Sequence, residues 1–108
     1  MKEKSMKFSL NIIRYCELLN VQKKYIISNQ LLRSGTAIGA LIHESKFAES
    51  RADFIHKLKI ALKEANETLY WLDLCENSEV YPSDFELKHD ADELVRILAS
   101  IVKSSTKS

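Results

Sequence analysis

Apolar residues recur every three or four positions along almost the whole chain, which is the spacing of one face of an α-helix. Short polar connections separate four such stretches, and we expect helices at about residues 5–19, 25–47, 51–76 and 84–102. The residues expected on their inward faces are Phe8, Ile12, Tyr15, Leu19, Ile27, Leu31, Gly35, Ile38, Ile42, Phe54, Leu58, Ala61, Ala65, Thr68, Leu72, Cys75, Leu87, Ala91, Leu94, Leu98 and Ile101. No stretch alternates with the period of a β-strand. The pattern therefore predicts an all-α fold, an antiparallel up-down-up-down four-helix bundle in one domain over residues 1–108.

Helix boundaries are signalled by small polar residues. Ser50 is predicted to cap the third helix, because Asp53 follows at the spacing of a capping box. Ser83, with Glu86 three residues later, is predicted to cap the fourth. We expect the polar tail, residues 103–108, to be frayed.

Both glycines of the chain lie in "LLRSGTAIGALI", inside the second predicted helix. A phosphate-binding loop would need a preceding strand and a lysine after the second glycine, and neither is present. Two glycines inside a helix cost about 2 kcal/mol of helix propensity. We therefore expect Gly35 and Gly39 to mark a close helix crossing or a kink.

The third helix carries a second set of apolar side chains, away from its predicted core face. On a helical wheel Ile60, Trp71 and Leu74 point outward, with Tyr70 at their border. The end of the fourth helix or the tail could fold over this stripe. We favour a contact with another copy of the chain, since most soluble oligomers are homo-oligomers.

The net charge of +1 conceals a strong asymmetry along the chain. Residues 1–63 contain 12 Lys or Arg against 5 Asp or Glu, whereas residues 64–102 contain 2 against 10. The asymmetry has three interpretations: an anionic partner for the first half, head-to-tail pairing between copies, or ordinary charged helix surfaces. The candidate nucleic-acid contacts are Lys7, Arg14, Lys23, Lys24, Lys59 and Lys63.

The sequence contains no pattern that predicts catalysis. Cys16 and Cys75 fall on or beside apolar faces and are expected to be reduced core thiols. Two acid-x-x-His pairs, at 53–56 and 86–89, have the spacing of di-iron bundles but lack inward carboxylates from the other helices. We expect no enzyme activity, metal, cofactor or small-molecule substrate. No apolar run is long enough for a membrane span, and we expect a cytoplasmic protein.

Three segments resemble a known family: "LLRSGTAIGA", "AESRADFIHKL" and "ALKEANETLYWL". They are similar to bacterial four-helix-bundle proteins encoded by intervening sequences within 23S ribosomal RNA genes. The resemblance covers nearly the whole chain. The signature positions that match are Arg33, Ser34 through Gly39, Ser50, Phe54, Lys63, Glu64, Glu67, Thr68 and Trp71.

The resemblance implies a single four-helix bundle that forms a ring-shaped homopentamer, with no catalytic residue. Relatives include the accessory variability proteins of diversity-generating retroelements, a branch implied to present basic surface to nucleic acid and to a reverse transcriptase. This chain differs from that branch in being nearly neutral, with an acidic last third. The expected function is a non-enzymatic oligomeric bundle associated with ribosomal or other structured RNA. The alternative is a ring-shaped protein-interaction scaffold that does not bind nucleic acid.

Overall fold

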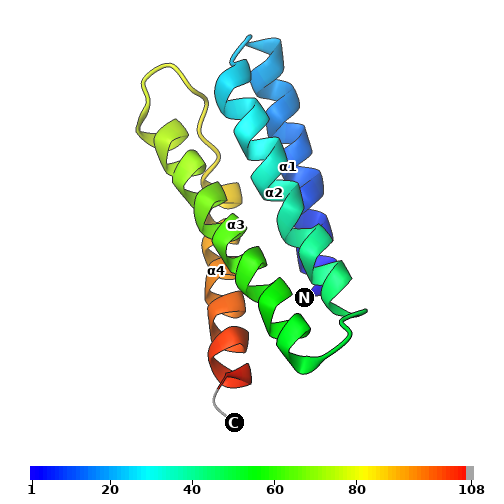
Figure 1. Cartoon of the computed structure of the whole chain (residues 1–108). Coiled ribbons are helices and arrows are strands. Elements are labelled where there is room, and N and C mark those ends of the chain that lie inside the picture. The colour runs from blue at the N-terminus through cyan, green and yellow to red at the C-terminus, as the bar shows by residue number, and fades with distance from the viewer. Residues whose placement is uncertain (107–108) are drawn as a thin grey trace.

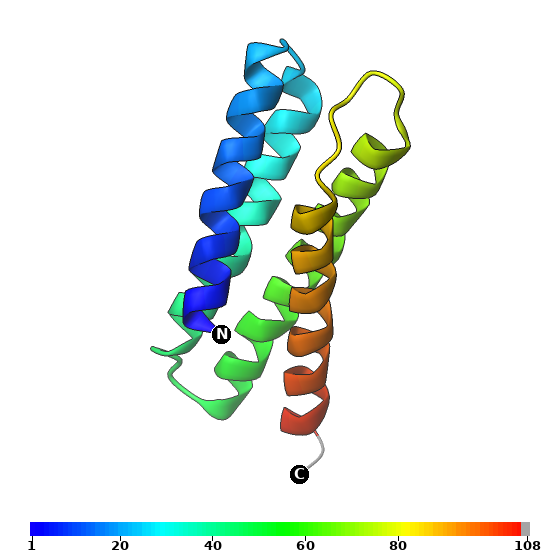
Figure 2. The same ribbon diagram turned by 180° about the vertical axis from the view of Figure 1, so that it is seen from behind.

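The computed structural model describes residues 1–106, which form four helices arranged up-down-up-down (Figures 1 and 2). The helices are α1 (Lys2–Val21), α2 (Tyr25–Ser45), α3 (Arg51–Asn77) and α4 (Phe85–Ser105). The bundle measures 47 × 21 × 21 Å, and its described residues include no strand. The predicted all-α, antiparallel four-helix bundle is therefore confirmed. None of the described helices is long and apolar enough to cross a membrane.

The helix ends differ from the prediction at several places, and α1 runs from Lys2 to Val21 rather than over about residues 5–19. The second helix stops at Ser45, because the amides of Lys46 and Phe47 bond three residues back, and this tighter turn leaves Phe47 exposed. The fourth helix continues to Ser105, so positions 103–105 are helical rather than frayed. Contacts of Ile101 and Val102 with the core hold this last turn. The predicted fraying of residues 107–108 lies outside the described residues.

One of the two predicted caps is confirmed and the other is displaced by one residue. Ser50 Oγ accepts the amide N–H of Asp53 at 3.0 Å, as predicted for α3. At α4 the cap is Asp84 rather than Ser83, and its carboxylate accepts the amide N–H of Leu87 at 2.9 Å. An aspartate caps as well as a serine and adds a negative charge at the positive end of the helix dipole.

The core contains the apolar positions that the periodicity selected, except that Ile27, Phe54 and Ile101 are only partly buried. Both cysteines are buried free thiols. A buried polar contact joins α2 and α3, where the Thr68 hydroxyl donates to Ser34 Oγ at 2.9 Å. Buried hydroxyls need such a partner to offset the loss of water.

The helices α1 and α2 approach one another very closely at Gly35. A Cβ atom added there would lie 2.8 Å from two side-chain carbons of the fully buried Ile12. At Gly39 the nearest atom would be Ser9 Oγ, at 3.1 Å. Neither glycine has a positive φ angle, so space rather than backbone freedom explains the glycine at 35.

Sequence neighbours form the closest helix pairs. The helix α2 packs on α1 and on α3, and α3 packs on α4, whereas α1 and α4 touch much less. Figures 1 and 2 show the bundle as two hairpins side by side, α1 with α2 and α3 with α4. The seam between α1 and α4 is consequently the loosest of the four helix contacts in the bundle.

Candidate functional site

The seam between α1 and α4 brings predicted basic contacts beside carboxylates of the same chain. Lys7 and Arg14 line one wall of a groove whose other wall includes Asp84, Glu86 and Asp90. Carboxylates of the same chain thus line the groove beside both cations, although neither cation forms an ion pair or hydrogen bond within residues 1–106. The negative field of these carboxylates makes Lys7 and Arg14 weaker candidates for phosphate contacts than cations without acidic neighbours.

Further along the seam, an ion pair joins Lys4 to Glu93. The hydrogen bond from the Lys4 ammonium holds the pKa of the Glu93 carboxyl below its ordinary value. A part of the charge asymmetry seen along the sequence is thus complementarity between the first and last helices. Helical periodicity cannot reveal it, because the seam joins residues from opposite ends of the chain.

The two lysines of the α1–α2 turn have local roles. Lys23 has φ 60°, the left-handed conformation that allows the chain to reverse between the helices. Lys24 Nζ lies 4.9 Å from the ring centroid of Tyr81, in the loop between α3 and α4. This cation–π contact ties the turn to that loop.

Lys59 and Lys63 lie in a different setting, on the exposed outer face of α3 with His56. We call His56, Lys59 and Lys63 the α3 basic strip. Within residues 1–106, neither lysine has an ion-pair or hydrogen-bond partner. The nearby α3 carboxylates bond elsewhere, Asp53 to the amide of Glu49 and Glu64 to Arg33. The strip is therefore the predicted basic surface that remains open to an anion.

The outward apolar stripe of α3 is only partly outward. Tyr70 and Leu74 are exposed, with relative accessibilities of 56% and 40%. Ile60 is half-buried, and Trp71 packs against the edge of the core. The helical wheel placed Ile60 and Trp71 outward with Leu74, whereas the structure leaves both side chains only partly exposed.

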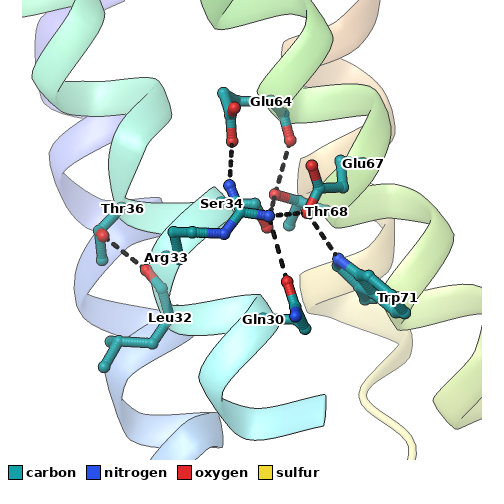
Figure 3. A network of polar contacts seen from close by, with 9 residues as sticks. All are labelled: Gln30, Leu32, Arg33, Ser34, Thr36, Glu64, Glu67, Thr68 and Trp71. Atoms are coloured by element: carbon teal, nitrogen blue, oxygen red, sulfur yellow. Dashed lines mark hydrogen bonds and ion pairs between the residues drawn. The ribbon is translucent and has the colours of Figure 1, made fainter. Parts of the chain in front are cut away.

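Trp71 belongs to a polar network that fastens α2 to α3 (Figure 3). Its indole N–H donates to Glu67 at 3.0 Å. The Arg33 guanidinium pairs with Glu67 and with Glu64, the latter at 3.2 Å, and also donates to Gln30. Six of the signature residues that carry the family resemblance thus take part in this network: Arg33, Ser34, Glu64, Glu67, Thr68 and Trp71. Their evident role is to hold two helices together.

We expect Arg33→Met to lower the free energy of unfolding by about 1 kcal/mol at low salt, because Glu64 and Glu67 then face each other without a cation. The loss should shrink at high salt, which screens their repulsion. Urea unfolding, followed by the fluorescence of the single tryptophan, measures it. Lys57→Met is the control, since its pair with Glu44 spans 3.8 Å. Equal effects of both substitutions would contradict a special role for Arg33.

A surface that sequence reasoning missed lies on the outer side of α1 and α2. A hollow of about 330 Å³ lies along the contact of the two helices and is lined by Lys2, Ser5, Met6, Ser9, Gly39, Ala40, Ile42 and His43. We call it the α1/α2 groove. Leu10 and Ile13 of α1, Leu32 of α2 and Phe47 just after α2 are further exposed apolar side chains. The four-residue spacing of Leu32, Thr36 and Ala40 was the available signal in the sequence.

Within residues 1–106, no group of three or more His, Cys, Asp or Glu side chains is arranged to hold a metal ion. The first of the two acid-x-x-His pairs, Asp53 and His56, does not form a metal site. His56 is exposed, and Asp53 accepts the backbone N–H of Glu49.

Comparison with known proteins agrees with this architecture. The chain matches the family described as "23S rRNA-intervening sequence protein" over residues 1–100. It is similar to a crystal structure of a protein with unknown function from the S23 ribosomal protein family of Bacteroides thetaiotaomicron VPI-5482. The two share 48% sequence identity with a TM-score of 0.87, over 94% of this chain and 97% of the other. No curated protein matches the chain. The family match spans nearly the whole bundle, and the chain therefore belongs to the 23S rRNA-intervening sequence protein family.

Proposed function

We propose that the protein is a self-assembling four-helix bundle that acts by binding structured RNA, with ribosomal RNA as the reference ligand, rather than by catalysis. The observation that carries the proposal is the α3 basic strip, whose lysines have no partner within residues 1–106. Cations in that state can contact phosphates without first breaking an internal ion pair. The family's name is consistent with a ribosomal RNA context.

Self-assembly is part of the proposal because one strip is small. Two lysines and a histidine provide few phosphate contacts, and each contact contributes only about one unit to the slope of log affinity against log salt. Several copies would present several strips to one RNA. Binding by linked copies raises the overall affinity well above that of a single strip.

The test compares two matched double substitutions, Lys59→Gln/Lys63→Gln on the strip and Lys7→Gln/Arg14→Gln on the seam. The probe is a fluorescently labelled structured fragment of 23S ribosomal RNA, with binding followed by anisotropy at about 50 mM salt. The strip variant should bind at least about tenfold more weakly, with a salt slope smaller by about two units per chain in contact. The seam variant should change affinity by less than about threefold, because its cations face carboxylates of the same chain.

The proposal fails if the wild-type protein shows no binding in the micromolar range at about 50 mM salt. It fails equally if affinity does not decrease with salt, or if the strip variant binds like wild type.

The second candidate is a protein-interaction scaffold without nucleic-acid binding. The α1/α2 groove favours it, because this hollow is lined by apolar and small side chains and its only formally charged lining residue is Lys2. Assembly without any RNA affinity would favour this candidate over the first.

A further inference from the structure

We propose that the hollow between α1 and α4 binds a basic amino acid of the lysine type. We call this hollow the α1/α4 groove, with Lys7 and Arg14 on one wall and Asp84, Glu86 and Asp90 on the other. Its volume of about 490 Å³ is within the range of small-molecule sites. The inference is independent of RNA binding, which uses the α3 basic strip.

The two walls of the groove carry opposite charges that do not contact each other. Lys7 and Arg14 are seven residues apart and therefore lie on one side of α1, and Glu86 and Asp90 are one turn apart on α4. Within the described part of the chain, residues 1–106, none of these four side chains forms an ion pair or a hydrogen bond. The adjacent part of the seam is different, because the Lys4 side chain pairs directly with a carboxylate of α4. The groove thus contains opposite charges that remain available to a ligand.

Such a groove favours a ligand that carries both signs of charge. The carboxylates of α4 repel a simple anion attracted to Lys7 and Arg14, and these two cations repel a simple cation attracted to α4. A ligand with a carboxylate and an ammonium group interacts favourably with both walls at once. The Arg14 guanidinium also has forked N–H donors, which match the two oxygens of a carboxylate.

The balance of charge narrows the ligand class further. The groove is lined by two formally positive and three formally negative side chains. A ligand with one net positive charge therefore balances it, and among amino acids this is the basic class. Such a ligand places its carboxylate towards α1 and its ammonium groups towards α4.

The floor of the groove suits the aliphatic stem of such a ligand. Tyr15 and Leu87 line the groove with exposures of only 4% and 2%, so they lie at its bottom, and the exposed Leu18 borders them. The Tyr15 hydroxyl already donates to the Pro82 carbonyl, and the ring is the part left to contact a ligand. Methylene groups pack on apolar surface of this kind while the charged ends reach polar groups.

The first test compares three small molecules of similar length. The probes are L-lysine, cadaverine, which lacks the carboxylate, and L-norleucine, which ends in a methyl group where lysine has its ammonium. Binding is followed by the backbone amide NMR signals of the full chain at one fixed ionic strength, about 50 mM. L-lysine should bind with a Kd on the order of 1 mM or lower, and each of the other two at least about tenfold more weakly. The signals that shift should lie in α1 and at the start of α4.

The second test removes one charge from each wall. Arg14→Gln and Asp90→Asn should each weaken L-lysine binding at least about tenfold. The matched controls are Arg96→Gln and Asp92→Asn, which remove the same charges from an ion pair of α4 outside the groove, and they should change the affinity by less than about twofold. Circular dichroism shows whether each variant is folded.

The proposal is overturned if L-lysine does not bind at about 10 mM, or if cadaverine or L-norleucine binds as tightly as L-lysine. It is equally overturned if the folded Arg14→Gln and Asp90→Asn variants bind L-lysine like wild type. RNA binding is measured separately on the same proteins. Lysine binding without RNA affinity would reject the proposed function alone, whereas RNA affinity without lysine binding would reject this inference alone.

Discussion

Replacing Gly35 with leucine should lower the free energy of unfolding by about 3 kcal/mol, near the upper end of overpacking effects. Even the first added carbon would lie 2.8 Å from Ile12, and Ile12 is fully buried between helices that cannot separate without losing core contacts. Leucine adds three further carbons to that overlap. Urea unfolding monitored by circular dichroism at one fixed protein concentration measures the change.

Two alanine substitutions separate crowding from helix propensity. Alanine favours a helix by about 1 kcal/mol over glycine at either position. At Gly39 its Cβ would meet only a serine hydroxyl that can rotate away, so Gly39→Ala should be neutral or mildly stabilising. At Gly35 the contact with Ile12 should reverse that gain. Trimming the neighbour in Ile12→Val/Gly35→Ala should restore part of the loss, and a wild-type midpoint for Gly35→Leu would place the close crossing elsewhere.

High pH should destabilise the protein strongly, through acids buried in their neutral form. Burial raises the pKa of Tyr15 far above its ordinary value of 10.0, and its hydroxyl donates to the carbonyl of Pro82. Burial also raises the pKa of the Cys16 and Cys75 thiols above 9.0. Above these ordinary values the unfolded chain releases protons that the folded chain retains. Each such group then costs about 1.4 kcal/mol of stability per pH unit.

Tyr15→Phe isolates the tyrosine contribution, under reducing conditions. At pH 8 the variant should be less stable than wild type by about 1 kcal/mol, because it lacks the hydrogen bond to Pro82. With rising pH wild type alone loses stability through this tyrosine, so the two stability curves should cross at about pH 11. Tyr25→Phe, at an exposed tyrosine, is the control and should run parallel to wild type. Parallel curves for Tyr15→Phe would show that Tyr15 ionises in the folded state as readily as in the unfolded state.

Much of the fold could be predicted because the inward face and the ends of each helix are encoded by residues within that helix. The repeat of Phe8, Ile12 and Leu19 defines an inward face without any knowledge of the partner helix. The start of α3 was predicted in the same way, because the capping hydrogen bond joins Ser50 to the amide of Asp53, only three positions later in the sequence. At the start of α4, Ser83 and Asp84 are both good caps, and the spacing rule selected the wrong one.

The candidate site was harder to predict, because a surface depends on which helices are neighbours. Lys7 and Lys59 are equivalent in the sequence, as exposed lysines on helices. In the bundle Lys7 shares a groove with carboxylates of α4, whereas Lys59 lies on the exposed face of α3 beside His56 and Lys63. Trp71 was likewise placed outward, although α2 lies beside it and a glutamate bonds its indole.

The sequence by itself determined the four helices, their inward faces and membership in the family, since these follow from spacing along one chain. Only the tertiary structure decided which charges are already neutralised, where Trp71 packs, and that a groove opens between α1 and α2. Periodicity states which side of a helix is buried. The neighbour on each flank is set by how the hairpins pack, and that neighbour determines whether a flanking side chain is paired, covered or available to a partner.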